Sequence, residues 1–94
     1  MISKLLKSTQ PGDDTIQIQM ADHSPTYHVG ADIIVGIAVP NGKDARWIKS
    51  IMPDPNKGMA KDGKYTIKFS EGMTHGHIAG QIVTTEYVRY RWWV

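Results

Sequence analysis

Glycine and proline recur so often along this chain that they leave only short segments for regular structure. The 94 residues include nine glycines and five prolines. No segment between them carries the apolar spacing of an amphipathic helix of about 11 residues, which is the average helix length. Short segments bounded by turn residues are typical of β-strands. We therefore expect an all-β protein.

Four segments carry the clearest strand patterns. Thr15–Met20 and Lys64–Ser70 alternate apolar and polar side chains, as a strand with one buried face does. Asp32–Pro40 is rich in β-branched residues and apolar on both faces, which predicts a central strand with either a bulge or a close backbone approach at Gly36. The sequence from Gln81 to Val94 has high β-propensity throughout and is expected to form one or two strands.

Two further segments are less regular. Pro25–Val29 fits a short edge strand, because a proline cannot donate a hydrogen bond to a neighbouring strand. Ala45–Met52 fits a helix, in which Trp47 and Ile51 share a face, and it also fits a strand. Its position after an Asn-Gly turn and before a proline favours the strand.

Six or seven short strands with turns at regular intervals predict a small antiparallel β-sandwich or a closed β-barrel. The order of the segments loosely resembles an immunoglobulin-like sandwich, with Trp47 on a middle strand, although the chain has no cysteine pair. We divide the chain into an N-terminal arm, residues 1–14, and a single β-domain, residues 15–94.

Length and charge limit the classes of function. A chain of 94 residues forms one domain with a thin core. Its net charge of +2 is too small to indicate nucleic-acid binding by itself. The absence of cysteine excludes disulfides and thiolate metal sites. No signal peptide and no apolar run of about 20 residues are found, so we expect no membrane span. The protein is expected to be made in the cytoplasm, where it stays or from which it is exported by a route that leaves no such signal; a virion is one expected destination.

The histidines are the candidate metal ligands. His75 and His77 are two residues apart, so on a strand they would share a face and hold a metal ion with a third ligand. His23, His28, Asp22 or a symmetry-related copy of the pair would supply that ligand. In these residues alone, the stretch resembles the His-x-His metal motif of trimeric phage spike tips. The alternative is that both histidines are solvated loop residues.

Catalytic motifs are lacking in the sequence. The aspartates Asp44, Asp54 and Asp62 lie in expected turns, where a carboxylate bonds to the backbone. No serine has the context of a nucleophile elbow, and the glycines do not form a phosphate-binding loop. We therefore expect no enzymatic activity and no cofactor.

The C-terminal sequence EYVRYRWWV favours a binding surface. Trp, Tyr and Arg are enriched at the centres of protein interfaces, and a thin core cannot easily bury all three tryptophans. On a strand, the arginines and two of the aromatic residues of this segment would share one face. The predicted partner-binding residues are Tyr87, Arg89, Arg91, Trp93 and Trp47. The alternative is that a loop such as Pro53–Lys64 folds over the tryptophan that the core does not bury.

Together these features predict a non-enzymatic structural or adaptor subunit of a larger assembly. The expected partner is a protein, either further copies of the chain or other subunits of a bacteriophage or virus particle, in capsid decoration, head–tail joining or the tail. One alternative is a small inhibitor that binds a host or defence factor. Another is a β-barrel that binds single-stranded nucleic acid through lysines and through bases stacked on aromatic side chains.

Overall fold

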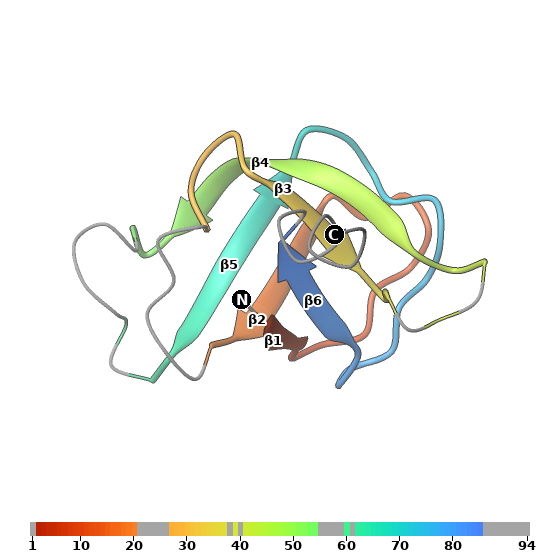
Figure 1. Ribbon diagram of the computed structural model, residues 1–94, viewed down its shortest axis with the longest axis horizontal. Helices are drawn as coiled ribbons and strands as arrows, with labels where there is room; N and C mark the ends of the chain where they lie inside the picture. Colours follow the sequence, from red (N-terminus) through yellow and green to blue (C-terminus); the bar gives the residue numbers. More distant parts are fainter. Residues whose placement is uncertain are drawn as a thin grey trace, which may run out of the picture.

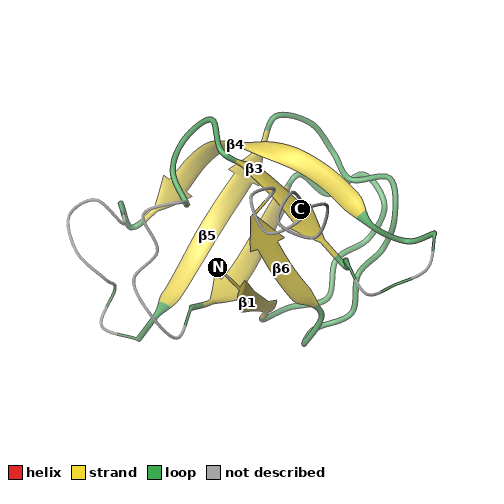
Figure 2. Cartoon of the chain, in the orientation of Figure 1, coloured by secondary structure: helices red, strands yellow, loops and turns green. Residues whose placement is uncertain are grey.

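The computed structural model describes residues 2–20, 27–37, 39, 41–54, 60 and 62–85. Within these residues all regular structure is β-strand (Figure 2), which confirms the prediction of an all-β protein. In this part of the chain there is no helix that is long and apolar enough to cross a membrane. The strands are β1 (Ile2–Leu5), β2 (Thr15–Gln19), β3 (Asp32–Val35), β4 (Asp44–Met52), β5 (Lys64–Phe69) and β6 (Ile82–Thr85).

The six strands form a closed barrel in the order β1-β2-β5-β4-β3-β6, and every neighbouring pair is antiparallel (Figure 1). Of the two predicted architectures, the closed barrel is therefore confirmed and the immunoglobulin-like sandwich is not the one that the described strands adopt. Strands β3, β4 and β5 are consecutive neighbours, and β6 returns to lie beside β3. This is a Greek-key arrangement.

Strand β1 closes the barrel. It pairs with β2 on one side and with β6 on the other, and Ser3 and Leu5 are buried. The segment expected to be an N-terminal arm, residues 1–14, therefore contributes a strand to the domain. This differs from the expected division at residue 15, because four residues with one clear apolar inward position are too short a pattern to recognise in the sequence.

The two alternating segments form the centre of the core. Ile16 and Ile18 of β2 are fully buried and pair with Ile67 and Tyr65 of β5, which are also buried. Phe69 completes the inward face of β5, whose burial alternates at every residue. This confirms the period-two pattern predicted for both segments.

Three other expectations are corrected or decided by the structure. Strand β3 ends at Val35, because Gly36 has a φ of +74° and turns the chain away, so Gly36 terminates the strand and does not form a bulge within it. The other alternative, a close approach at Gly36, is confirmed, because a Cβ there would lie 2.9 Å from His77 Nδ1. The predicted edge strand at Pro25–Val29 is wrong for its described residues, which form no strand. Ala45–Met52 belongs to β4 and is not helical.

Candidate functional site on strand β4

Trp47 is the predicted partner-binding residue that the structure describes. It lies on β4 opposite Asp32 of β3, and its side chain is 47% exposed. The other residues predicted for this surface, Tyr87, Arg89, Arg91 and Trp93, lie outside the described residues. Of the predicted surface, the structure therefore describes the part that lies on β4.

A bulge controls which side chains β4 presents to solvent. The register with β5 shifts between Ile48 and Ser50, so one more residue is accommodated on β4 than on its partner. Ile48 and Ile51 point inward, while Lys49 and Ser50 are both exposed. Met52 follows with 69% of its surface exposed. We call the exposed residues Trp47, Lys49, Ser50 and Met52 the outer strip of β4.

Strand β4 extends four residues past Ile48, beyond the point where β3 begins at Asp32. Among the described residues, the last backbone contacts on this side are at Ile48, which accepts a hydrogen bond from the Gly30 N–H (2.8 Å) and donates one to the Ala31 carbonyl (2.9 Å). Beyond them the two chain segments diverge and leave an open pocket of about 500 Å³. The pocket is lined by His28, Val29, Ser50, Ile51 and Asp54.

The wall of this pocket is held to the barrel by Tyr27. The side chain of Tyr27 is fully buried, and its hydroxyl lies 3.0 Å from Ser3 Oγ and 3.1 Å from the carbonyl oxygen of Val83. Burial raises the pKa of Tyr27 to about 12, although the hydrogen bond with Ser3 acts in the opposite direction. The adjoining Val29 remains 61% exposed beside the pocket.

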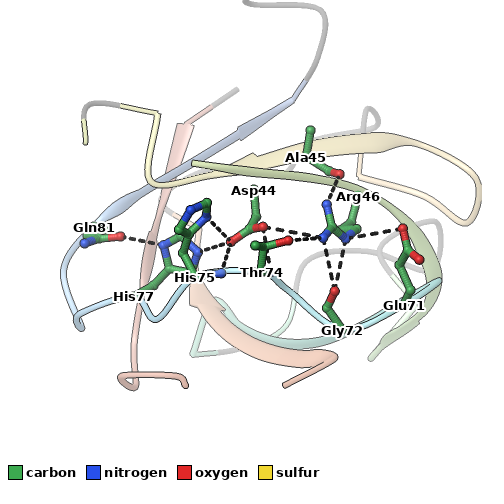
Figure 3. Close-up of polar contacts among 9 residues, drawn as sticks. All are labelled: Asp44, Ala45, Arg46, Glu71, Gly72, Thr74, His75, His77 and Gln81. Carbon is green, nitrogen blue, oxygen red and sulfur yellow. Dashed lines mark hydrogen bonds and ion pairs between the residues drawn. The ribbon is translucent and has the colours of Figure 1, made fainter. Parts of the chain in front are cut away.

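A buried polar cluster lies at the other end of β4 (Figure 3). Asp44 is the first residue of the strand and is 3% exposed. Its carboxylate accepts hydrogen bonds from the backbone N–H groups of Thr74 (2.8 Å) and His75 (3.0 Å) and from His77 Nε2 (2.7 Å). These contacts attach the loop between β5 and β6 to the start of β4.

The surroundings of Asp44 favour its ionised form. Burial by itself raises the pKa of this carboxyl, but the hydrogen bonds from His77, Thr74 and His75 and the electrostatic attraction of His77 together outweigh it. The pKa of Asp44 is therefore lowered from its ordinary value of 3.8. Arg46 adds a guanidinium nitrogen at 3.5 Å from Oδ1.

Arg46 is occupied by contacts within the molecule. Its Nε and Nη2 atoms donate to the Gly72 carbonyl at 3.2 and 3.1 Å, and Nη2 also donates to Thr74 Oγ1 at 3.1 Å. Nη1 donates to the Ala45 carbonyl at 2.8 Å, and Glu71 forms a longer ion pair at 3.7 Å. This arginine therefore fixes the loop and does not add to a basic surface for nucleic acid.

His77 has partners at both ring nitrogens. Nε2 contacts Asp44, and Nδ1 lies 2.9 Å from Gln81 Oε1. An imidazolium ring can donate to both oxygens, and a neutral ring fits if the Gln81 amide is rotated to donate to Nδ1. An Asp–His pair is also the geometry of general acid–base catalysis. Here the His77 side chain is completely buried, so neither nitrogen is presented to a substrate, and the pair serves to hold the loop.

The predicted metal ligands meet at the same carboxylate. His75 and His77 lie in a loop and not on a strand; His75 Nδ1 is 3.5 Å from Asp44 Oδ2, and its side chain is 42% exposed. Among the described residues, no three His, Cys, Asp or Glu side chains are grouped so that they could hold a metal ion. The metal assignment of His75 and His77 stays a prediction.

Sequence reasoning did not identify the cluster or the pocket. Asp44 follows an Asn-Gly turn and was expected to bond to the local backbone, whereas its partners lie about 30 residues further along the chain. The pocket depends on where the chain that leads into β3 first pairs with β4, and no residue type marks that point. The sequence matches no protein-family model and no curated protein, and the fold matches no solved structure.

Proposed function

We propose that this protein is a structural or adaptor subunit without catalytic activity, and that it binds a protein partner through the outer strip of β4 and the adjoining pocket. The observation that carries this proposal is the exposure of Trp47 in the middle of β4, of Met52 at its end and of Val29 beside the adjoining pocket. Large apolar side chains that remain exposed together are typical of surfaces that a partner covers.

The chemistry of this surface favours protein over nucleic acid. Val29 and Met52 have no aromatic face on which a base could stack, so Trp47 is the one aromatic side chain of this surface among the described residues, and Arg46 is engaged within the fold. Lys64 and Lys68 are exposed on β5, but lysines that alternate with buried residues are ordinary for the solvent face of a strand. A bacteriophage or virus particle is the setting we propose on sequence grounds, and an inhibitor of a host or defence factor is the alternative.

The test is binding by purified variants. Trp47→Ala and Met52→Lys are compared with the wild type in co-purification from the organism that makes the protein, and each captured partner is then purified and titrated calorimetrically. Removing a central interface tryptophan is expected to weaken binding by about 2 kcal/mol or more. Ile78→Ala is the matched control, because Ile78 is 70% exposed on the loop between β5 and β6.

Two outcomes contradict the proposal. One is a partner that binds wild type, Trp47→Ala and Met52→Lys with equal affinity. The other is a fluorescent oligonucleotide that binds more tightly than any protein, with the strong salt dependence that phosphate contacts produce. Light scattering after size-exclusion chromatography distinguishes a self-assembling subunit from a monomeric inhibitor.

A further inference from the structure

We propose that the end of β4 accepts an extended segment of the protein partner as an additional β-strand, which lies in the pocket between Lys49–Met52 and the turn at residues 28–29. This deepens the proposed function and rests on it, because it names the form that the partner takes at the same surface. In this mode of binding the partner contacts the backbone of β4 as well as its exposed side chains.

The backbone groups of Ile51 face the pocket. Hydrogen bonding alternates along an antiparallel ladder, so successive residues of a strand turn their N–H and C=O groups to opposite sides. The backbone N–H of Phe69 on β5 donates to the Asp14 carbonyl on the β2 side, so the backbone N–H and C=O of Ile67, two residues earlier, also point toward β2. Ile51 lies opposite Ile67, so its own N–H and C=O point away from β5.

On that side β4 lacks a strand partner among the described residues after Ile48. The pairing of β3 with β4 covers Asp44 to Trp47, and Gly30 and Ala31 extend it only as far as Ile48. The remaining four residues, Lys49–Met52, form an edge about 14 Å long at 3.4 Å per residue. An unpaired edge of this kind is a template for a strand from another chain.

The pocket has the position and size for one such strand. It lies beside Ser50 and Ile51, on the side where the next strand of a sheet would be, and its far wall is formed by His28 and Val29. A volume of about 500 Å³ is within the usual range of binding pockets. A bound strand would present alternate side chains to the exposed apolar surfaces of Met52 and Val29.

The same geometry favours a slender segment over a second copy of the barrel. Two copies paired through β4 about Ile51 would place Lys49 opposite Pro53, which has no N–H to donate. Each copy would also bring its own turn at residues 28–29 toward the other. An extended peptide needs only the space between that turn and the strand, and it satisfies the Ile51 backbone with its own main chain.

The experiment uses the full chain and a library of short random peptides displayed on a surface. Selected peptides are synthesised and bound to the wild type, and a backbone N-methyl group is then introduced at each peptide position in turn. If the peptide adds as a strand, N-methylation at alternate positions weakens binding about tenfold, because each of those positions loses a main-chain hydrogen bond. At the positions between them, the change stays below about threefold.

Amide hydrogen exchange of the protein gives a second readout. Saturation with peptide slows exchange at the Ile51 N–H at least about tenfold, while the Met52 N–H, which faces β5, changes little. Trp47→Ala and Met52→Lys test the side-chain surface in the same titrations, and Ile78→Ala serves again as the control.

The outcomes separate this inference from the proposed function. One outcome is that peptide binding is weaker to Trp47→Ala but does not alternate with the N-methylated position, and that exchange of the Ile51 N–H is unchanged. This outcome overturns strand addition but is consistent with binding through the side chains. Self-association that protects Ile51 without added peptide assigns the edge to a second copy and also overturns it. Selected peptides that bind every variant equally overturn both.

Discussion

The two halves of β4 belong to one continuous strand but have different neighbours. From Asp44 to Trp47 the strand is paired with β3, and Asp44 and Arg46 contact the loop between β5 and β6. From Ser50 to Met52 its one strand partner among the described residues is β5, and an open pocket lies at its other edge. Figure 1 shows β4 crossing the whole barrel, so the difference lies in its neighbours.

This comparison shows how a small barrel separates stability from binding. At the first half, a buried carboxylate is surrounded by donors, and removing it would leave them without an acceptor. At the second half, the exposed side chains make few contacts within the fold, so they are available to a partner at little cost in stability. Changes at Asp44 should therefore affect stability, whereas changes in the outer strip of β4, which includes Trp47, should affect binding.

The largest expected effect on stability is that of Asp44→Ala. Without the carboxylate, the N–H groups of Thr74 and His75 and the buried ring of His77 have no acceptor. Breaking a buried charged network of this kind costs about 3–5 kcal/mol. Urea unfolding followed by tryptophan fluorescence measures the loss. Glu71→Ala is the control for charge, because Glu71 is mostly exposed and should change stability by less than about 0.5 kcal/mol. A loss below about 1 kcal/mol for Asp44→Ala would contradict the role assigned to the cluster.

The same contacts predict an acid limit to stability. Because the folded state lowers the pKa of Asp44, this group stabilises the protein above its ordinary pKa of 3.8, and the contribution is lost as the pH falls through the folded value. Asp44→Asn cannot ionise and should lack this part of the acid dependence. Thermal melts of both proteins between about pH 6 and pH 2 measure it, and parallel profiles would show that Asp44 does not contribute.

Tyr27, in the wall of the pocket, predicts that the protein loses stability at alkaline pH. The folded state raises the pKa of Tyr27 from 10.0 to about 12, so its stabilisation is complete below pH 10 and is lost as the pH rises toward 12. At 1.36 kcal/mol per pKa unit the loss is roughly 2–3 kcal/mol. Tyr27→Phe should be less stable than wild type near neutral pH by about 1 kcal/mol and should lose less on alkalinisation. Equal losses in the two proteins above about pH 10 would contradict the burial argument.

Gly36→Ala tests how closely the backbone at the end of β3 approaches the side chains of His77 and Gln81. A Cβ at this position would lie 2.9 Å from His77 Nδ1 and 3.0 Å from Gln81 Oε1, in addition to the strain of a φ of +74°. Gly80→Ala is the matched control, because Gly80 has a φ of +96° with no atom within 4 Å of the added carbon. The control measures backbone strain of about 1–2 kcal/mol, and Gly36→Ala should exceed it by about 1–2 kcal/mol. Equal unfolding free energies for the two variants would contradict this prediction, because the His77 and Gln81 side chains would then make room for the added carbon without measurable cost.

The smallest expected effect on stability belongs to Met52→Lys. Met52 is 69% exposed on the open half of β4, so the change should alter the free energy of unfolding by no more than about 0.5 kcal/mol. Chemical denaturation beside wild type measures this. A loss of about 2 kcal/mol would mean that Met52 is part of the core, and its effect on binding could then no longer be attributed to the surface.

Much of the barrel could be predicted from local patterns. The alternation in Thr15–Gln19 and Lys64–Phe69 places their apolar residues inward, since side chains of a strand alternate between faces. The exposed Trp47 could be proposed as a surface residue from composition alone. The N-terminal strand could not be found in this way, because Ile2–Leu5 is ordered by pairing with residues near the other end of the described chain.

Spacing over a few residues is enough to predict the all-β class and the inward residues of β2 and β5. It does not predict that β1 closes a barrel, that Asp44 contacts the loop of His75 and His77, or that the end of β4 is open. Each of these depends on contacts between residues far apart in the chain. Such contacts arise from the packing of the whole barrel and leave no signal in neighbouring residues.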